Sequence, residues 1–218
     1  MRILAVGDVV DPLLYAESDQ SRWQQAGVSA VISCGDLPPD YLCFLAGRFQ
    51  APLFYVLGNH NGSYRYNPPA GCVSIDGRLL RWQGLRLLGV GGAPPHNGGS
   101  EQYSERAMAL RLLRHRAAIW RQGAPDLVIS HAPPRFSSDQ PPRRNRVTTS
   151  GDASGTPHSN APDPGHRGFL AFGNLIRRSQ PRFWLHGHTH LAYGTSGRES
   201  QVGSTRVINV YGHCLIEL

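Results

Sequence analysis

The sequence predicts an α/β fold in which buried strands alternate with helices. Short apolar runs, each closed by glycine or another turn residue, are typical of buried strands. Segments with helical spacing lie between these runs, and this alternation is typical of helices packed on a layered sheet. The predicted strands are Arg2–Val6, Val28–Ser33, Pro52–Leu57, Asp126–Ser130 and Arg182–Leu185.

The helical segments are marked by apolar spacing and by residues that stop a helix. The longest has an apolar stripe that includes Met108 and Ile119, and Gly123-Ala124-Pro125 ends it. Pro181 closes the last one. The predicted helices are Ser18–Ala26, Pro39–Arg48, Tyr103–Gln122 and Phe169–Arg178.

Two further pairs of apolar runs carry a hairpin signal, a glycine-containing dipeptide between strand-like segments. In the first pair, Leu79–Trp82 and Leu85–Val90 flank Gln83-Gly84. In the second pair, Arg206–Val210 and Cys214–Leu218 flank Tyr211-Gly212. The sequence therefore predicts antiparallel pairs beside the parallel strands, which favours two stacked sheets.

A chain of 218 residues fits a single domain, residues 1–218, with a sizeable core. The sequence has no run of about 18 apolar residues, so we expect no membrane span. The first residues, MRILAVGDVV, are typical of a strand rather than of a signal peptide, so we expect a cytoplasmic protein. The cysteines form no Cys-x-x-Cys pair, and buried thiols are favoured over a zinc site or a disulfide framework. They are Cys34, Cys43, Cys72 and Cys214.

The chain carries a net charge of +7, and all 22 of its basic residues are arginine. This charge is compatible with an anionic substrate but does not identify one. Arginines are dense over 106–121, where a solvated helix face is favoured over a nucleic-acid patch. Residues 137–165 are polar, rich in proline, glycine and serine, and without periodicity, which is typical of a functional or disordered loop. Their place between His131 and the last histidines makes them a candidate lid.

Polar side chains follow the predicted strands at the point where each strand ends. In layered α/β sheets, ligands bind just beyond the carboxyl ends of the strands, so we expect these side chains to converge. Carboxylate and amide oxygens mixed with imidazole nitrogens suit Mn, Fe, Co, Ni or Zn. One carboxylate held between two cations would build a two-metal site, with cations about 3.5–4 Å apart. The residues are Asp8, Asp36, Asn59-His60, His131 and His188-Thr189-His190.

These motifs, in this order, resemble those of the calcineurin-like binuclear metallophosphoesterases. The resemblance covers residues 2–211, and a stretch over 163–169, Asp-Pro-Gly-His-Arg-Gly-Phe, is similar to small single-domain bacterial members. It implies a four-layer αββα sandwich with two mixed β-sheets, the metallo-dependent phosphatase fold, and hydrolysis of phosphate mono- or diesters. The motifs are Gly7-Asp8, Gly35-Asp36, Gly58-Asn59-His60, Ser130-His131-Ala132-Pro133-Pro134 and Gly187-His188-Thr189-His190.

The resemblance also implies roles for these residues, carried over by position. Two divalent transition metal ions are expected, with Mn favoured and Fe, Ni, Co or Zn as alternatives. Asp36 resembles the carboxylate that bridges them, and His60 resembles the catalytic histidine near the leaving group. Ligands of the first metal are Asp8 and His190, and the remaining ligands of the second are Asn59, His131 and His188.

Two departures from the family pattern concern the first metal and the catalytic histidine. The family's Asp-x-His is here Asp8-Val9-Val10, so the first metal loses an imidazole. Asp11 is one residue late for that place, and a turn-capping role is favoured for it. Asn61 stands where the family often has an acid, which makes the neighbouring histidine a weaker general acid because an amide does not stabilise imidazolium as a carboxylate does.

The expected reaction is attack of a bridging hydroxide, activated by the two metals, on a phosphate ester of a small molecule or nucleotide. His60 would protonate the leaving oxygen, and a diester is mildly favoured because a weak general acid tolerates a good leaving group. His166 and Arg167 are candidate phosphate contacts, with turn and helix-start roles as the alternative. Two other functions stay open: a weakened phosphate- or nucleotide-binding scaffold with an incomplete first metal site, and a nuclease with salt-sensitive binding.

Overall fold

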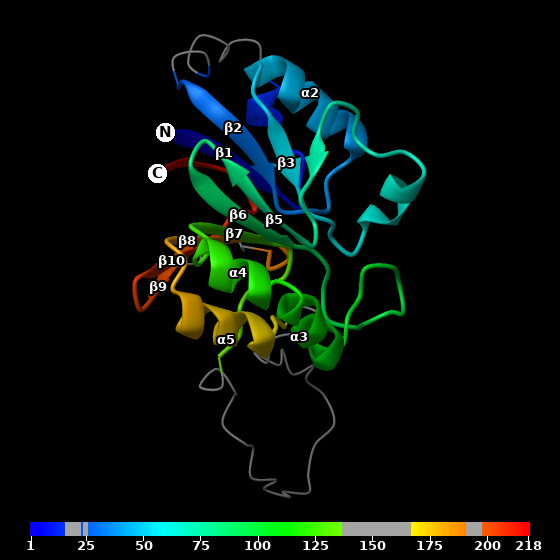
Figure 1. The fold of residues 1–218 in the computed structure, drawn as a ribbon. Coiled ribbons are helices and arrows are strands. Elements are labelled where there is room, and N and C mark those ends of the chain that lie inside the picture. Colours follow the sequence, from blue (N-terminus) through cyan, green and yellow to red (C-terminus); the bar gives the residue numbers. More distant parts are fainter. Residues whose placement is uncertain (16–22, 24–25, 137–166, 191–197) are drawn as a thin grey trace, which may run out of the picture.

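Residues 1–15, 23, 26–136, 167–190 and 198–218 are described by the computed structural model (Figure 1). Most of the predicted helix Ser18–Ala26, and all of the candidate lid over 137–165, lie outside the described residues. In the described part of the chain, the strands form two mixed sheets. The first contains, in spatial order, β11 (Gly212–Glu217), β1 (Arg2–Gly7), β2 (Val28–Ser33), β3 (Leu53–Tyr55) and β4 (Val73–Ser74). The second contains β5 (Arg78–Trp82), β6 (Leu85–Val90), β7 (Leu127–Ser130), β8 (Phe183–His186), β10 (Thr205–Asn209) and β9 (Glu199–Val202).

The two sheets face each other, and helices cover their outer faces (Figure 1). Helix α2 (Pro39–Phe49) lies on the first sheet, and α3 (Glu105–Leu113), α4 (Arg116–Gln122) and α5 (Leu170–Ser179) lie on the second. Short 3-10 helices, η1 (Pro12–Leu14) and η3 (Asn61–Arg65), follow the ends of β1 and β3. This arrangement confirms the predicted four-layer αββα sandwich.

Strand β1 shows why the strands read as continuous apolar runs. Ile3 and Ala5 point into the core between the two sheets, whereas Leu4 and Val6 pack against the layer that contains α2. All four side chains are fully buried. A strand covered on both faces needs apolar residues at every position, so it lacks the alternation of a half-exposed strand.

Parallel pairing brings several strand ends to one edge of the molecule. In the first sheet, β1, β2 and β3 run parallel, and in the second, β6, β7, β8 and β10 run parallel. The loops that carry the predicted ligands leave β1, β2, β3, β7 and β8 at their carboxyl ends. The topology therefore places all of these loops at the same end of the sandwich.

The hairpin predicted for Arg206–Val210 and Cys214–Leu218 is wrong. Strand β10 pairs with β8 and β9 in the second sheet, while β11 pairs with β1 along its whole length in the first. Gly212, with a φ of 77°, lies where the chain crosses from one sheet to the other. The chain does bend at Tyr211, as the dipeptide Tyr211-Gly212 indicates. The two strands that flank it nevertheless join different sheets, because each pairs with strands that are distant in the sequence.

The other predicted elements need smaller adjustments. The first hairpin is confirmed, since β5 and β6 pair antiparallel around Gln83-Gly84, both with positive φ. The long predicted helix Tyr103–Gln122 is two helices, α3 and α4. The N–H of His115 donates to the carbonyl of Leu112 at 3.0 Å, a three-residue spacing that interrupts the α-helical bonding between them. Among the described residues, no helix has the length and apolar character needed to cross a membrane.

Candidate metal centre

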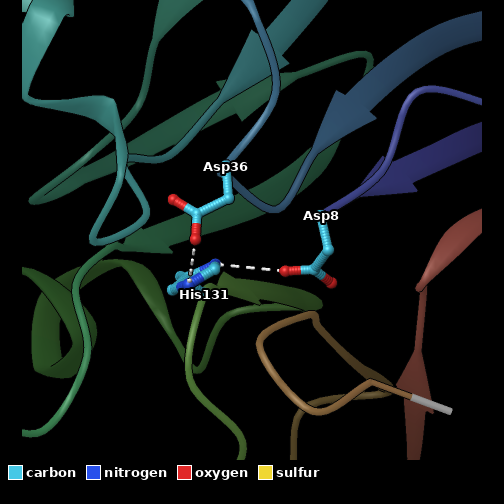
Figure 2. A group of neighbouring side chains, drawn as sticks. All are labelled: Asp8, Asp36 and His131. Carbon is cyan, nitrogen blue, oxygen red and sulfur yellow. Dashed lines mark ion pairs between the residues drawn. The ribbon is translucent and has the colours of Figure 1, made fainter.

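A buried cluster of two carboxylates and one imidazole lies where the two sheets meet. Asp8 directly follows β1, Asp36 follows β2, and His131 directly follows β7 on the facing sheet. Figure 2 shows both carboxylates pointing toward the His131 ring from the sheet opposite. One ligand atom from each of the three side chains fits within 4.8 Å of the others, which is close enough to hold one metal ion.

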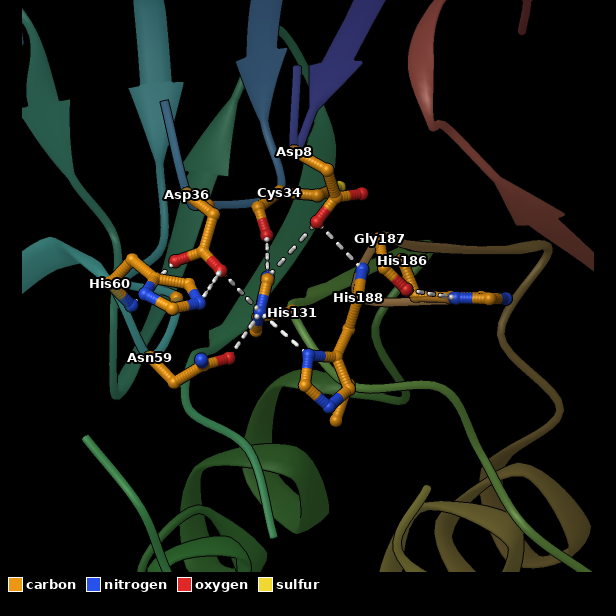
Figure 3. A network of polar contacts seen from close by, with 12 residues as sticks. Asp8, Cys34, Asp36, Asn59, His60, His131, His186, Gly187 and His188 are labelled. Atoms are coloured by element: carbon orange, nitrogen blue, oxygen red, sulfur yellow. Dashed lines mark hydrogen bonds and ion pairs between the residues drawn. The ribbon is translucent and has the colours of Figure 1, made fainter. Parts of the chain in front are cut away.

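The Nε2 atom of His131 is the centre of this cluster (Figure 3). It lies 3.2 Å from Asp36 Oδ2, 3.0 Å from Asn59 Oδ1 and 3.1 Å from His188 Nδ1. The other ring nitrogen, Nδ1, donates to the carbonyl of Cys34 at 2.9 Å. Because a carbonyl only accepts, this bond fixes the hydrogen on Nδ1 and leaves a lone pair on Nε2 in the neutral ring. A metal-binding histidine held by a backbone carbonyl has this arrangement.

The backbone at three of the cluster residues is in the left-handed region. Asp8 has a φ of 67°, Asp36 of 59° and His188 of 65°. Non-glycine residues adopt this conformation at a cost of order 1–3 kcal/mol, and they persist where the surrounding structure holds them. Part of that support is visible: the N–H of His188 donates to Asp8 Oδ1 at 2.8 Å, and the N–H of His60 donates to Asp36 Oδ1 at 2.8 Å.

Glycines let the carboxylates approach the neighbouring loops. A methyl group on Gly58 would lie 2.1 Å from Asp36 Oδ1, and one on Gly187 would lie 2.5 Å from Asp8 Oδ2. Gly35, with a φ of 99°, would place a methyl group 2.6 Å from the backbone nitrogen of Gly58. The glycines in the Gly-Asp, Gly-Asn-His and Gly-His-Thr-His motifs thus allow close contact with a carboxylate or with the neighbouring loop.

The carboxylate of Asp8 has the character of a cation ligand. Its side chain is 2% exposed, and its Oδ2 atom is buried without a hydrogen-bond partner among the described residues. Burial raises the pKa of Asp8, although the nearby charge of His131 and the N–H of His188 oppose this. A buried carboxylate oxygen with no donor is costly, and a cation would compensate for that cost. The donor set and this oxygen therefore fit a divalent metal.

Asp36 and His131 stabilise each other's charged forms. Burial alone would raise the pKa of Asp36, but the hydrogen bond and charge of His131 outweigh it and lower this pKa. Burial would likewise lower the pKa of His131, but Asp36 raises it through its hydrogen bond and charge, with help from Asp8. A positive charge at this position is therefore favoured by the chain itself, whether a proton or a cation carries it.

His190 lies at the rim of the cluster rather than in its centre. It is exposed, and its ring contacts that of Tyr211 with centroids 5.0 Å apart. The charge of His190 also lowers the pKa of Asp8, although it is the weakest of the influences on that carboxylate. Val10, at the position of the missing imidazole, is 39% exposed.

Asp11 caps a turn, as predicted. Its Oδ1 accepts from the N–H of Leu13 at 3.0 Å, and its Oδ2 lies 2.6 Å from His213 Nδ1. Both oxygens are thus engaged by the chain. His186 is buried, and burial lowers its pKa to about 4, so its ring is neutral at pH 7. Its Nδ1 lies 3.0 Å from the carbonyl of Gly187, next to the ligand loop.

His60 and Asn61 differ sharply in exposure. The His60 side chain is 72% exposed, and its Nε2 lies 4.0 Å from Asp36 Oδ2, so the ring faces the mouth of the cluster. Asn61 is buried, and its Oδ1 accepts from the N–H groups of Asp36 at 2.8 Å and Gly58 at 2.7 Å. Its Nδ2 donates to the carbonyl of Leu37 at 3.2 Å. Asn61 therefore ties the β2 and β3 loops together, a role that no motif in the sequence indicates directly.

The predicted phosphate contacts are placed only in part. Arg167 is exposed, three residues before α5, and His166 lies outside the described residues. The Cys34 carbonyl that holds His131 is another functional group without a direct signal in the sequence. A glycine before Asp8, Asp36, Asn59 and His188 could have indicated tight loops, but backbone contacts across two sheets are visible only in the folded chain.

The fold and the cluster together define a class of protein: a two-sheet α/β sandwich with a candidate carboxylate–imidazole metal site between the strand ends. More specifically, the chain belongs to the calcineurin-like phosphoesterase family, whose model matches residues 1–192. This membership makes the chain a metal-dependent phosphoesterase by family. The comparison with curated proteins gives no match.

Solved structures support the same fold. The TT1561 protein of Thermus thermophilus is similar with a TM-score of 0.61 at 16% identity, covering 97% of this chain and 89% of that one. A phosphopantetheinyl hydrolase from Mycobacterium tuberculosis has a TM-score of 0.54 at 14% identity, covering 96% and 88%. A structure described as a putative 5'-nucleotidase from Staphylococcus aureus has a TM-score of 0.54 at 14% identity, covering 99% of this chain and 50% of that one.

Proposed function

We propose that this chain hydrolyses a phosphodiester with the help of two divalent transition metal ions, Mn being the favoured metal. The observation that carries the proposal is the convergence of four donor atoms, from Asp36, Asn59, His131 and His188, beside the unpartnered oxygen of Asp8. Mixed oxygen and imidazole donors are the set that borderline transition metals prefer.

The two cation positions draw on different parts of the cluster. The second metal would be held by His131, Asn59, His188 and one oxygen of Asp36. The donor atoms of the last three already lie around His131 Nε2. Asp8, the bridging Asp36 and His190 would hold the first. Val10 offers no ligand there, and Asp11 is engaged by Leu13 and His213, so the first position has fewer protein ligands.

When bound, the cations would neutralise the phosphate oxygens and make a water molecule acidic enough to attack phosphorus. The chain itself supplies alignment and a proton. The left-handed backbone of Asp8, Asp36 and His188 fixes the ligand directions before substrate arrives. His60, which is exposed beside the cluster, would give a proton to the leaving oxygen.

A diester of a small molecule or nucleotide is the substrate class that this site favours. Asn61 engages two N–H groups and a carbonyl of the backbone, so it does not act as a carboxylate that strengthens His60 as an acid. A weak general acid serves a good leaving group better than a poor one. Two structurally similar proteins, the phosphopantetheinyl hydrolase and the putative 5'-nucleotidase, are named for phosphate-ester substrates, which supports phosphate esters as the broader substrate class.

The experiment is a panel of aryl phosphate mono- and diesters, assayed with Mn²⁺, Ni²⁺, Co²⁺, Zn²⁺ or Mg²⁺. We expect turnover of diesters with Mn²⁺ to exceed that of monoesters. Turnover restricted to monoesters would contradict the diester preference. No turnover with any of these metals would contradict the proposed hydrolytic activity.

Replacing His60 by alanine separates its role from metal binding. We expect His60→Ala to keep its metal content and to lose about 10²–10⁴-fold in turnover, the usual contribution of a general acid. His96→Ala, which removes another exposed histidine, is the control and keeps full activity. Full activity of His60→Ala would overturn its assignment.

The incomplete first site favours one alternative, a phosphate-binding scaffold without turnover. Titration of the metal-free protein distinguishes the two by stoichiometry. We expect two Mn²⁺ ions per chain for the enzyme. One tightly held ion, together with no hydrolysis of aryl diesters, would favour the scaffold.

A further inference from the structure

The outer face of the second sheet carries a hollow that the proposed chemistry does not use. It lies between α3 and α4 on one side and α5 on the other, with a volume of about 740 Å³. Leu110, Leu113 and Trp120 line it from α3 and α4, and Ala171 and Leu175 line it from α5. None of the candidate metal ligands lines this hollow. We call it the α3–α5 groove.

The apolar side chains of the groove are unusually exposed for their size. Trp120 is 86% exposed, Leu110 61% and Leu113 49%. Single exposed apolar residues are ordinary, but several that line one hollow mark a binding surface. Tryptophan is also among the residues most enriched at the energetic centres of interfaces.

The helices around the groove carry a net positive charge. Within α3, α4, α5 and the turn between α3 and α4, Glu105 is the acidic residue. Its carboxylate accepts from the N–H groups of Leu170 and Ala171, so it is engaged at the start of α5. The arginines of these segments are Arg106, Arg111, Arg114, Arg116, Arg121, Arg177 and Arg178.

Two of these arginines face the groove from opposite sides. Arg116 on α4 and Arg178 on α5 both line it, and both are exposed. In contrast to Arg111, which pairs with Asp76 at 2.9 Å, neither forms an ion pair with any residue in the described ranges. The groove thus combines an apolar floor with uncompensated positive charge at its edges.

We propose that the α3–α5 groove docks an amphipathic helix of a partner protein whose apolar side chains are flanked by Asp and Glu. An apolar helix face laid into a groove is a recurring recognition mode, with anchors at helical spacing. The arginines select acidic flanks and speed the encounter by long-range attraction. The leucine-lined floor offers nothing to phosphates, which disfavours nucleic acid.

A displayed library of random 16-residue peptides, selected on the full-length protein, tests this proposal. The library is counter-selected on the double variant Trp120→Ala/Arg178→Glu, in which both the apolar anchor and one charged edge are changed. We expect the enriched peptides to share leucine-type residues at helical spacing with Asp or Glu between them. We expect the double variant to bind them at least 10-fold more weakly by fluorescence anisotropy.

Controls separate the groove from general stickiness and from lost folding. Leu215→Ser/Arg81→Glu changes an exposed apolar residue and an exposed arginine elsewhere, and it keeps full affinity. We expect thermal unfolding to show that both double variants are folded, and we expect phosphodiester turnover to be unchanged in both.

Three results would overturn the proposal. One is enrichment of peptides without acidic residues, and another is equal affinity for the groove variant and the native chain. The third comes from parallel assays with a 30-residue single-stranded DNA and with phosphatidylserine vesicles. Binding of either that the groove variant abolishes, without enriched acidic peptides, would assign the surface to that ligand instead.

Discussion

At the scale of single residues, the candidate metal centre depends on groups that hold its side chains in place. His131 is directed by the Cys34 carbonyl, and Asp36 is directed by the N–H of His60. The side chain of Asn61 accepts from the N–H groups of Asp36 and Gly58, and so it fixes the backbone of both loops. Because these contacts are directional, and those of the Cys34 carbonyl and the Gly58 N–H are also buried, small changes next to a candidate ligand are expected to act on metal affinity before they act on the fold.

Gly187 offers a direct test of the packing around Asp8. In Gly187→Ala, the new methyl group would lie 2.5 Å from Asp8 Oδ2, so the carboxylate must move away from the cluster. We expect Mn²⁺ affinity, measured by calorimetric titration, to fall about 10–100-fold. The matched control is Gly47→Ala in α2, where a methyl group meets nothing within 4 Å. It should keep its affinity and gain up to about 1 kcal/mol of stability. Unchanged affinity in Gly187→Ala would contradict a role for Asp8.

Asn61 can be dissected by comparing two replacements. Asn61→Ala leaves the N–H groups of Asp36 and Gly58 without their acceptor, at about 1–3 kcal/mol for each buried donor. Asn61→Asp keeps that acceptor but turns a carboxylate oxygen toward the carbonyl of Leu37. We therefore expect urea unfolding to rank stability as native, then Asp, then Ala. Equal losses of stability in the two variants would contradict this ranking, because the acceptor oxygen that Asn61→Asp retains would then contribute nothing.

At the scale of elements, distant contacts fix how the strands of the second sheet begin and end. Arg86 at the start of β6 and Asp126 just before β7 form a bidentate pair, with Nε–Oδ2 at 2.8 Å and Nη2–Oδ1 at 2.9 Å. Asp126 Oδ2 also accepts from the N–H of Arg86. Arginine–carboxylate pairs joined by two parallel hydrogen bonds are among the stronger charged hydrogen-bonded pairs in proteins. This pair aligns β6 with β7.

The Arg86–Asp126 pair predicts a dependence of stability on pH. The hydrogen bond and charge of Arg86 lower the pKa of Asp126 below that of the unfolded chain, about 3.9. Its stabilising effect is therefore complete above that pH and is lost as pH falls through the lowered folded-state pKa. We expect Asp126→Asn to cost about 1–2 kcal/mol at pH 7 and progressively less below pH ~4, by urea unfolding. Glu217→Gln, in an exposed pair with Arg2, should cost less than about 1 kcal/mol at pH 7. A cost of Asp126→Asn that grows in acid would refute the assignment.

At the scale of the whole molecule, the candidate centre joins the two sheets. Asp8, Asp36 and Asn59 come from loops of the first sheet, and His131 and His188 come from loops of the second. A bound ion would thus cross-link the layers at one end of the sandwich. Metal that binds the folded chain alone stabilises it by mass action.

Removal of metal should therefore lower the melting temperature. At a Mn²⁺ concentration 100 times the dissociation constant, the gain is about 2.7 kcal/mol. For a chain of this size, 1 kcal/mol corresponds to about 2–4 °C, so we expect Mn²⁺ to raise Tm by about 5–10 °C over chelator-treated protein. Scanning calorimetry measures this. Asp36→Asn, which changes the carboxylate that we propose to bridge the two ions, should lose most of the shift. A shift of the same size in Asp36→Asn would place the stabilising ion elsewhere.

The amino-acid pattern alone was enough to predict most strands and helices and the polar donors at the strand ends. It was enough because a strand buried on both faces must be apolar throughout, and because a ligand loop must begin where that run stops. Asp8, Asp36, Asn59, His131 and His188 could be predicted from this rule and from their motifs.

Which atoms meet was settled only by the folded chain, because that depends on pairing between segments far apart in the sequence. Folding assigned β10 and β11 to different sheets, against the local turn signal. It also engaged Asn61 and the Cys34 carbonyl, set three cluster residues at positive φ, and left Asp8 Oδ2 buried. Each of these features results from two sheets meeting at one edge, and no local pattern in the sequence encodes that meeting.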